Sequence, residues 1–479
     1  MINNRISSAF FFKFAERALV KIVGLVISVV LARLLEPETF GLLAIISVFI
    51  NLANTFVLNG FTTALVQNRT ANHKDYSTVY YTTSGIAIVL IMILFFIAPY
   101  VAKVYHAPEL ITPLRVMALS LIPGSLNAVQ NAKLQRELRL KEMMICNIFA
   151  TVIAGIAGIL IAMTKPGIWA LVVYQCGHTI LSAVVMLPIS GWYPKREFSI
   201  DRVKEFFSFG SRILVSSLLC SIYSDLRALI IGYRYSTLDL AQYTKAQQYP
   251  ETISYTVDST ISTVLIPVMS SLQDSVGEMH SLMMKIVRVS VYMVTPMMLG
   301  LAAVSETFIP LLLTEKWNGC IPLMRYFCFA YLSLPIGTAG LCYIKACGRS
   351  DIYLRAEVIR RMIMLCILLI TVFSFNTVNA IAVGYAFSAW LDAVIVIVFT
   401  RHCGGPKFTE YCKITWKTYL SGLAMYFVVV LLNKISCLLF YKLILQITSG
   451  ICIYIGMSLV SKEKSLIDIY QKIKSSASK

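Results

Sequence analysis

Three basic side chains recur at helical spacing inside the first long apolar stretch of the sequence. Lys13, Arg17 and Lys21 are four residues apart, so on a helix they share one face, and Glu16 lies beside that face. A helix rises about 1.5 Å per residue, which places Lys21 about 15–18 Å past the start of the stretch and near mid-bilayer. A lysine at this depth reaches the membrane surface poorly. The pattern predicts the cationic lining of a polar passage, with structural pairing or a different start of the span as the alternatives.

Two arginines in later apolar stretches are candidates for the same task. Arg212 and Arg360 are predicted to bind an anionic substrate together with Arg17 and Lys21, because guanidinium and ammonium groups are good partners for phosphate. A purely structural role for Arg212 and Arg360 stays open. Asp392 is expected to pair with Arg360 or with the arginine that follows it.

Three acidic residues in these stretches could exchange a proton or pair with a neighbouring helix. Glu16 could pair with the basic face of the first stretch, and a hydrogen bond between helices is the favoured role of Asp225 and Asp258. Proton coupling through Glu16 or Asp258 is the functional alternative, and downhill transport without coupling is equally consistent. Nearby tyrosines could stack on sugars, although anchoring at the membrane interface is the commoner role; they are Tyr223, Tyr243, Tyr249 and Tyr255.

The composition is not that of a soluble globular protein. Of 479 residues 58% are hydrophobic and only 14% are charged, whereas a soluble domain carries about 25% charged residues. The formal charge of +18 lies mostly in short segments between apolar stretches, which is typical of topology signals, so no nucleic-acid partner is expected. The twelve cysteines form no C-x-x-C pair and no cluster with histidine. Neither a disulfide framework nor a metal site nor a cofactor is expected.

Apolar stretches of about 20 residues predict an all-α integral membrane protein with about fourteen transmembrane helices. Twelve or thirteen helices are the alternatives, because the stretches at 205–233 and 240–269 carry several polar groups. The expected spans are 9–33, 39–64, 78–102, 112–133, 142–164, 167–189, 205–233, 240–269, 285–313, 321–346, 351–374, 377–400, 413–433 and 438–461.

Basic residues are unevenly divided between alternate connections. One set of connections, with the two tails, holds roughly 25 basic residues and the other roughly seven, which predicts that the N- and C-termini are both cytoplasmic. No connection much exceeds about fifteen residues, which leaves no room for the extramembrane domain of a glycosyltransferase or polymerase. No phosphate-binding G-x-x-x-x-G-K-[ST] loop, H-E-x-x-H motif or Ser/His/Asp pattern stands out. We therefore expect no enzyme, and unusual chemistry within the membrane is the remaining alternative.

Short motifs repeat between the two halves of the chain. Leu119-Ser-Leu-Ile-Pro123 recurs as Leu332-Ser-Leu-Pro335, and Lys133-Leu-Gln-Arg136 matches the position of Lys345-Ala-Cys-Gly-Arg349 at the same offset. Six spans per half would give the halves the same orientation about an axis along the membrane normal. The sequence thus predicts an N-terminal lobe at 1–200, a C-terminal lobe at 201–402 and a central cavity. Two extra helices and a basic tail follow at 403–479.

The turn after the first span carries the most distinctive motif. Leu31-Ala-Arg-Leu-Leu-Glu-Pro-Glu-Thr-Phe-Gly41 resembles the "ARLL-x-P-x-x-F/Y-G" stretch of bacterial oligosaccharide flippases. Residues 225–232, 240–246 and 264–267 are similar to further signatures of that family, with Ala241 where glycine is usual. The likeness covers most of residues 5–400. It points to the polysaccharide transporter branch of the multidrug/oligosaccharidyl-lipid/polysaccharide flippase superfamily.

The resemblance implies a two-lobed bundle with a cationic lumen in the bacterial inner membrane. Such proteins carry undecaprenyl-diphosphate-linked oligosaccharides from the cytoplasmic to the outer leaflet, for O-antigen, capsule or exopolysaccharide. The implied partners are the lipid-linked oligosaccharide, membrane lipid, and polymerase or assembly proteins. A multidrug or small-molecule antiporter of the same architecture is the main alternative, and a non-transporting scaffold is another. An antiporter of cations would favour acidic residues, whereas the first span is net basic.

Overall fold

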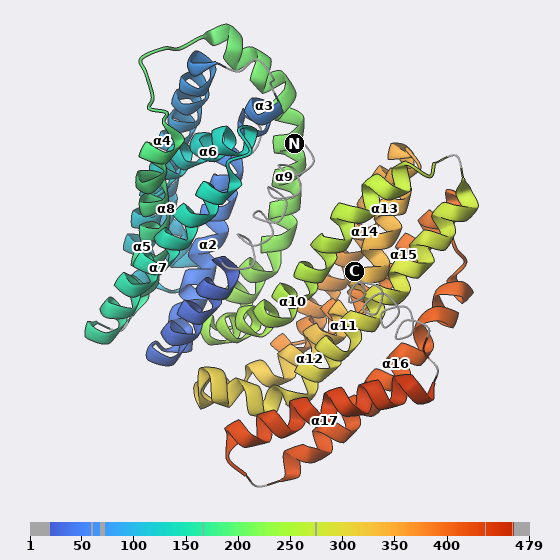
Figure 1. The fold of residues 1–479 in the computed structure, drawn as a ribbon. Helices are drawn as coiled ribbons and strands as arrows, with labels where there is room; N and C mark the ends of the chain where they lie inside the picture. The colour runs from blue at the N-terminus through green and yellow to red at the C-terminus, as the bar shows by residue number, and fades with distance from the viewer. Residues whose placement is uncertain are drawn as a thin grey trace. The chain divides into compact units, whose positions relative to one another are not determined.

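The chain folds into helices throughout its described part. The computed structural model describes residues 20–58, 61–67, 72–165, 167–273, 275–435, 437–461 and 463. Two compact units are present, the first ending at Ala241 and the second beginning at Gln242 (Figure 1). The predicted all-α fold class is confirmed.

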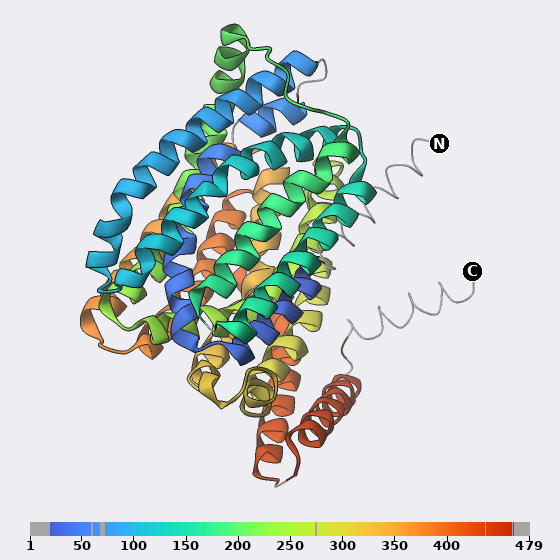
Figure 2. The same cartoon turned by 90° about the vertical axis from the view of Figure 1, so that its left-hand side faces the viewer.

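The first unit contains a helix over residues 20–34 and eight further α-helices. These are α2 (Pro37–Leu58), α3 (Phe61–Gln67), α4 (His73–Val104), α5 (Ile111–Leu119), α6 (Leu121–Arg136), α7 (Leu140–Thr164), α8 (Ile168–Ser190) and α9 (Ile200–Arg234), with a 3₁₀ turn at Pro108–Leu110. Figure 2 shows the long helices of this unit, coloured from blue to green, running beside one another. Small residues permit this closeness: a Cβ on Gly158 of α7 would lie 3.0 Å from the Ala170 carbonyl oxygen of α8.

Helix α9 packs with the first unit along α2 and α3. At its start, Arg202 pairs at 3.2 Å with Asp75, which is buried in the first turn of α4. Phe206 is buried in an apolar cluster with Tyr76 and Trp192. The compact units therefore divide the chain at residue 241. The predicted lobe limits at 200 and 402 concern internal repetition and stay a prediction.

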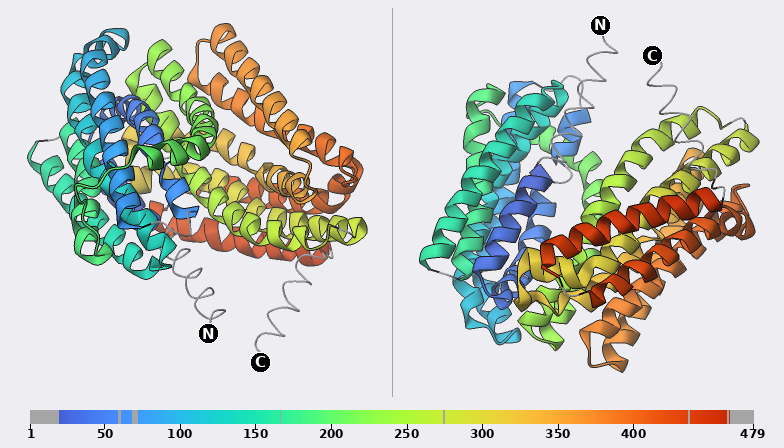
Figure 3. Two further views of the ribbon diagram at one scale, coloured as in Figure 1. Left: turned by 90° about the horizontal axis from the view of Figure 1, so that it is seen from above. Right: turned by 60° about the horizontal axis from the view of Figure 1, so that its bottom comes forward.

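The second unit is organised around the long helix α11 (Val276–Leu313). It takes in most of α10 (Thr237–Ser270), and its other helices are α12 (Cys320–Tyr331), α13 (Leu334–Ala346), α14 (Ser350–Ser374), α15 (Val378–His402), α16 (Phe408–Leu431) and α17 (Leu439–Val460), with 3₁₀ turns at Glu315–Trp317 and Leu432–Lys434. Helix α11 packs against α12, α13, α16 and α17. In Figure 3, α16 and α17 are at the red end of the colour scale. The core combines Met283, Val287, Tyr343 and Ile397 from α11, α13 and α15.

The repeated Leu-Ser-Leu motifs interrupt a helix in both units. Helix α5 ends and α6 begins around Ser120, and α12 gives way to α13 at Ser333. The hydroxyl of Ser120 donates to the Met117 carbonyl at 2.6 Å, and that of Ser333 donates to the Ala330 carbonyl at 2.9 Å. Each serine is followed within three residues by a proline, Pro123 or Pro335, which has no N–H to donate to the backbone hydrogen bonds of a continuous helix. The same break, preceded by a long helix and a 3₁₀ turn and followed by two long helices, supports an internal repeat.

Eleven helical stretches in the described part, each one helix or two consecutive helices, are long and apolar enough to cross a membrane. Each expected span from residue 39 onward coincides with one helix or with two consecutive helices. The two of these expected spans outside the eleven are α10, which carries polar residues throughout, and α14, whose charged residues lie in its first half. The protein is a multi-pass membrane protein, and the count of fourteen spans stays a prediction.

Candidate functional site

The basic face predicted for the first helix is described only at its last member. Lys21 lies in the helix over residues 20–34, and its side chain is exposed. Lys13, Glu16 and Arg17 lie outside the described residues. Arg212 belongs to α9, and its side chain likewise falls outside what is described. The predicted grouping of these cations therefore stays a prediction.

Asp225 joins two helices of the first unit. Its carboxylate lies on α9 and accepts hydrogen bonds from Asn51 of α2 and from Ser221, one turn earlier on α9. Thr55 of α2 completes the group through a 3.5 Å hydrogen bond to the Ser221 hydroxyl. This geometry is that of a polar contact between packed helices, which is the pairing role considered for Asp225.

Arg360 is buried between two carboxylates of the second unit. Its Nε and Nη2 atoms donate to the two oxygens of Asp392 on α15, the latter at 2.8 Å, and Nη1 donates to Glu357 at 3.0 Å. Only 9% of Arg360 is exposed. The predicted pairing of Asp392 with Arg360 is confirmed. Glu357 also holds Arg361 at 3.4 Å, so one carboxylate bridges two guanidinium groups.

A polar stripe runs along α10 on the second unit. Gln247, Glu251, Tyr255 and Asp258 follow at intervals of four, four and three residues, so they share one helical face, which we call the α10 polar face. Asp258 hydrogen-bonds to Thr338 of α13 through its carboxylate, and its Oδ1 atom is buried without a hydrogen bond. Both the pairing role and the coupling role considered for Asp258 are compatible with this position.

Three tyrosines from three helices meet at the α10 polar face. Tyr331 of α12 accepts a hydrogen bond from Gln247 at 3.2 Å and another from the Tyr385 hydroxyl of α15 at 3.4 Å. The ring centroids of Tyr255 and Tyr331 lie 6.3 Å apart, and those of Tyr331 and Tyr385 lie 6.2 Å apart. The Tyr255 hydroxyl is within electrostatic range of Glu251, Asp258 and Arg361.

The four tyrosines considered from the sequence differ in their surroundings. Tyr243 and Tyr249 are buried, with their rings edge-on to Phe327 and Phe308, so they belong to the core. Tyr223 accepts a hydrogen bond from Arg227. Tyr255 is 45% exposed and lies on the α10 polar face between Glu251 and Asp258.

Sequence reasoning missed Gln247, Tyr331 and Tyr385. The spacing of Gln247 with Glu251, Tyr255 and Asp258 was available as a signal in the sequence. Tyr331 and Tyr385 lie 84 and 138 residues from Gln247 along the chain, and apolar neighbours surround both in the sequence. No local pattern identifies them, because their contact depends on how α10, α12 and α15 pack.

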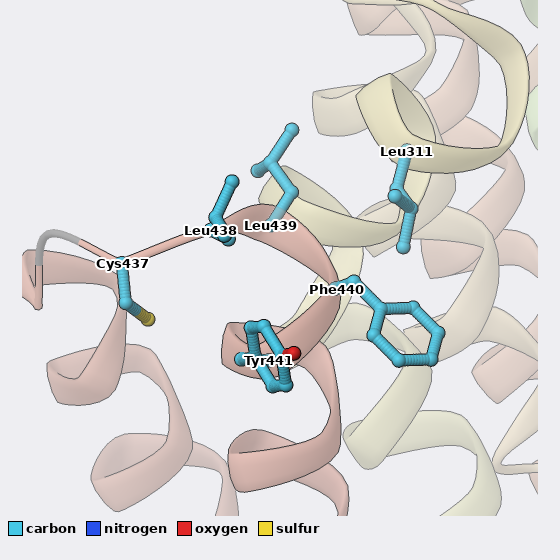
Figure 4. A pocket seen from close by; sticks show the side chains of 6 residues that line it. All are labelled: Leu311, Cys437, Leu438, Leu439, Phe440 and Tyr441. Carbon is cyan, nitrogen blue, oxygen red and sulfur yellow. The ribbon is translucent and has the colours of Figure 1, made fainter.

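An open apolar hollow lies elsewhere on the second unit. It has a volume of about 740 Å³ and lies where α17 begins, beside the end of α11 (Figure 4). Its lining is Leu311, Cys437, Leu438, Leu439, Phe440 and Tyr441. None of the ionisable residues considered for substrate binding lines it, so the polar contacts of α10, α14 and α15 form the better candidate site.

The fold is that of known membrane transporters. The structure of the lipid II flippase MurJ in an inward closed conformation superposes with a TM-score of 0.76 at 16% identity, covering 96% of this chain and 99% of MurJ. An inward-facing multidrug resistance MATE family transporter of the MOP superfamily superposes with a TM-score of 0.62 at 15% identity, covering 83% and 95%. At these identities the likeness defines the fold class: a multi-helix membrane transporter architecture.

The family follows from the sequence match. The family model described as polysaccharide biosynthesis protein matches residues 30–322, more than half of the chain. The chain belongs to this polysaccharide biosynthesis protein family. It is 24% identical over 349 residues to the lipopolysaccharide biosynthesis protein WzxC of Escherichia coli (strain K12), covering 72% of this chain and 70% of WzxC.

Proposed function

We propose that the chain is a flippase for lipid-linked oligosaccharides in the bacterial inner membrane. It carries undecaprenyl-diphosphate-linked repeat units from the cytoplasmic to the outer leaflet, where they supply O-antigen, capsule or exopolysaccharide. The observation that carries the proposal is the set of charged and polar contacts on α10, α14 and α15, helices of transmembrane length. Membership of the polysaccharide biosynthesis family and the likeness to MurJ and WzxC support the same function.

The mechanism separates the polar head group from its lipid tail. The polyprenyl tail stays in the bilayer while the diphosphate and sugars cross the membrane by alternating access. A diphosphate in a low-dielectric medium needs cationic partners, because an unpaired buried anion is prohibitively costly. Arg17, Lys21 and Arg212 supply that charge. Arg360 is already paired with Asp392, so it binds the diphosphate only if a phosphate group displaces a carboxylate.

Transport rather than covalent chemistry is the proposed activity. The N- and C-termini both face the cytoplasm, as the distribution of basic residues favours. The flipped substrate is handed to polymerase or assembly proteins of the same polysaccharide. Glu16 and Asp258 are the candidates for proton coupling, and downhill flipping driven by consumption of the product needs neither.

A multidrug or small-molecule antiporter is the second candidate function. The likeness to a MATE family transporter favours it, as do the acidic residues Glu251, Asp258, Glu357 and Asp392 within the second unit. The lower TM-score of that likeness and the basic face of the first helix favour the flippase. A deletion strain that becomes drug-sensitive while its surface polymer is unchanged would decide for the antiporter.

The deciding experiment is deletion of the gene in a strain without a second flippase. We expect loss of the surface polymer and accumulation of complete undecaprenyl-diphosphate-linked repeat units on the cytoplasmic face, both reversed by the wild-type chain. The variant Arg17→Ala/Lys21→Ala should be present at normal levels and fail to restore export. The control Lys103→Ala/Lys165→Ala removes the same charge from exposed helix ends and should restore it. Unchanged polymer in the deletion strain would refute the flippase function, and export by the first double variant would refute the cation assignment.

A further inference from the structure

The α10 polar face of the second unit is not a simple anion site. Outside the first and last two turns of α10, α14 and α15, the basic residues are Lys245, Arg360 and Arg361, and the acidic residues are Glu251, Asp258, Glu357 and Asp392. Four acidic groups against three basic groups give no net positive charge. A diphosphate would meet carboxylates here as often as cations, so these helices are poorly suited to bind it.

The surface that the α10 polar face forms with Arg361 of α14 is unsuited to contact with lipid. Arg361 is eleven residues into α14, about 16 Å from its first residue, and 43% of its side chain is exposed. An arginine exposed to lipid near the bilayer centre is strongly unfavourable. Among the described helices of the second unit, α10 and α14 are predicted spans that are too polar to rank with the apolar membrane-crossing stretches. The surface around Tyr255 and Arg361 therefore faces a polar passage.

The chemistry of this surface matches a polyhydroxyl ligand. An exposed tyrosine ring offers an apolar plane of fixed orientation, and carboxylate, amide and guanidinium groups around it can accept or donate hydrogen bonds. Around Tyr255 these groups are Glu251, Asp258 and Arg361, with the Tyr331 and Tyr385 rings behind it. A pyranose has one apolar C–H face and a rim of hydroxyls, so it needs both kinds of partner and no net charge.

We infer that the α10 polar face, together with Arg361 of α14, is a glycan subsite that binds a sugar ring of the substrate and leaves the diphosphate to other residues. This inference rests on the proposed flippase function and divides the substrate between two places in the chain. The C–H face of the sugar packs on the Tyr255 ring. Its hydroxyls donate to Glu251 and accept from Arg361. The Gln247–Tyr331–Tyr385 hydrogen bonds hold the aromatic wall behind the ring in one orientation.

The test compares Tyr255→Leu with Tyr255→Phe in the deletion strain. Leucine removes the ring, and phenylalanine keeps it and removes the hydroxyl. We expect Tyr255→Leu to lower export of surface polymer about tenfold, the value of roughly one aromatic contact, at normal protein level. Tyr255→Phe should export near the wild-type rate. Tyr100→Leu, which removes a tyrosine that is 75% exposed on the apolar helix α4, is the matched control and should export normally.

A binding measurement separates the glycan subsite from the diphosphate site. Purified protein in nanodiscs is titrated with undecaprenyl diphosphate, which has no sugar, and with the lipid-linked fraction extracted from the deletion strain. Tyr255→Leu should bind the first probe like the wild type and the second about tenfold more weakly. Equal loss for both probes, or normal export by Tyr255→Leu, would overturn the glycan subsite while the flippase function stands. A deletion strain without lipid-linked build-up would overturn both.

Discussion

The ion triad of Arg360 shows how one buried charge constrains a membrane helix pair. Arg360 on α14 binds both oxygens of Asp392 on α15 and a third oxygen on Glu357. Burying these groups is costly, and the cost is met only while all partners are present. The triad therefore fixes the register between α14 and α15. Its neighbour Arg361 is more exposed and bound by one of the same carboxylates, so the two adjacent arginines have different roles.

Removal of Arg360 should destabilise the protein far more than removal of Arg361. Arg360→Met leaves Asp392 without its partner and should lower the free energy of unfolding by roughly 3–5 kcal/mol. Arg361→Ala removes a more exposed ion pair, worth about 1 kcal/mol or less. The detergent-purified variants are heated to a series of temperatures, and the folded fraction that remains at each temperature is measured by size-exclusion chromatography.

The double variant Arg360→Met/Asp392→Leu tests the cause. It removes both members of the bidentate pair and leaves Glu357 with Arg361, so it should recover much of the lost thermal stability. A double variant as unstable as Arg360→Met would show that the loss comes from packing around the arginine rather than from an unpaired carboxylate.

At the level of elements, close approach of backbones explains the glycine that ends the Leu31–Gly41 motif without any reference to function. Gly41 of α2 lies against the first residue of α10: a Cβ on Gly41 would overlap the Thr237 carbonyl group. Here the obstacle is backbone, which cannot rotate away as a side chain can. The glycine of the Leu31–Gly41 segment is therefore required by the packing of α2 on the start of α10.

Gly41→Ala should separate these two helix starts and destabilise the protein. We expect a loss of about 1–3 kcal/mol, the range for overpacking a filled site. Gly85→Ala is the matched control, because Gly85 lies inside α4 with open space around its missing Cβ, and alanine there should be neutral or slightly stabilising. Equal melting temperatures of the two variants would contradict the close contact between α2 and α10.

The C-terminal ends of α13 and α15 are in contact through two cysteine side chains. Cys347 and Cys403 follow directly after these helices and hydrogen-bond to each other. Prolonged oxidation with diamide should link them within one chain, with loss of two thiols from maleimide labelling of the subsequently denatured protein. The single variant Cys347→Ser should not form this link. Labelling of both thiols after oxidation would mean that the two helix ends are apart.

The same thiols should react slowly at neutral pH. Burial raises the pKa of Cys347 to about 11 and raises that of Cys403 as well. The thiolate is the nucleophile, so its small fraction at pH 8 limits alkylation, and the rate should rise about tenfold per pH unit up to about pH 11. Iodoacetamide labelling of Cys347, followed by peptide mass spectrometry across this pH range, measures the slope. A rate independent of pH would show that Cys347 is already ionised.

At the scale of the whole molecule, the distribution of basic residues makes a prediction about orientation. The connection between α6 and α7 contains Arg139 and is flanked by Lys133, Arg136 and Lys141, whereas the connection between α7 and α8 contains Lys165. The basic connection should be cytoplasmic and the other external. Alkaline phosphatase should be active when fused between α7 and α8 and inactive when fused between α6 and α7. A fluorescent protein at the C-terminus should fluoresce, and the reverse pattern would invert the topology.

Most of the helix positions could be predicted from the sequence because membrane insertion is a local requirement. A run of about 20 apolar residues is enough to specify a spanning helix, whatever it later contacts. The breaks at Ser120 and Ser333 were harder to see, because a serine and a nearby proline are both tolerated within membrane helices. The repeated motif marked the two positions, and only the structure showed that both interrupt a helix.

Some residues of the candidate site could likewise be predicted from the sequence, and others could not. Charges at Asp258, Arg360 and Asp392 could be recognised in the sequence, because an ionisable residue inside an apolar run is costly wherever it points. The sequence could not show which of these charges neutralise one another, because Arg360 and Asp392 are 32 residues apart on separate helices. Tyr331 and Tyr385 carried no signal at all, because tyrosine is unremarkable in a membrane helix. Apolarity and charge are properties of single residues and short runs, whereas hydrogen-bonded partners are set by the packing of distant helices.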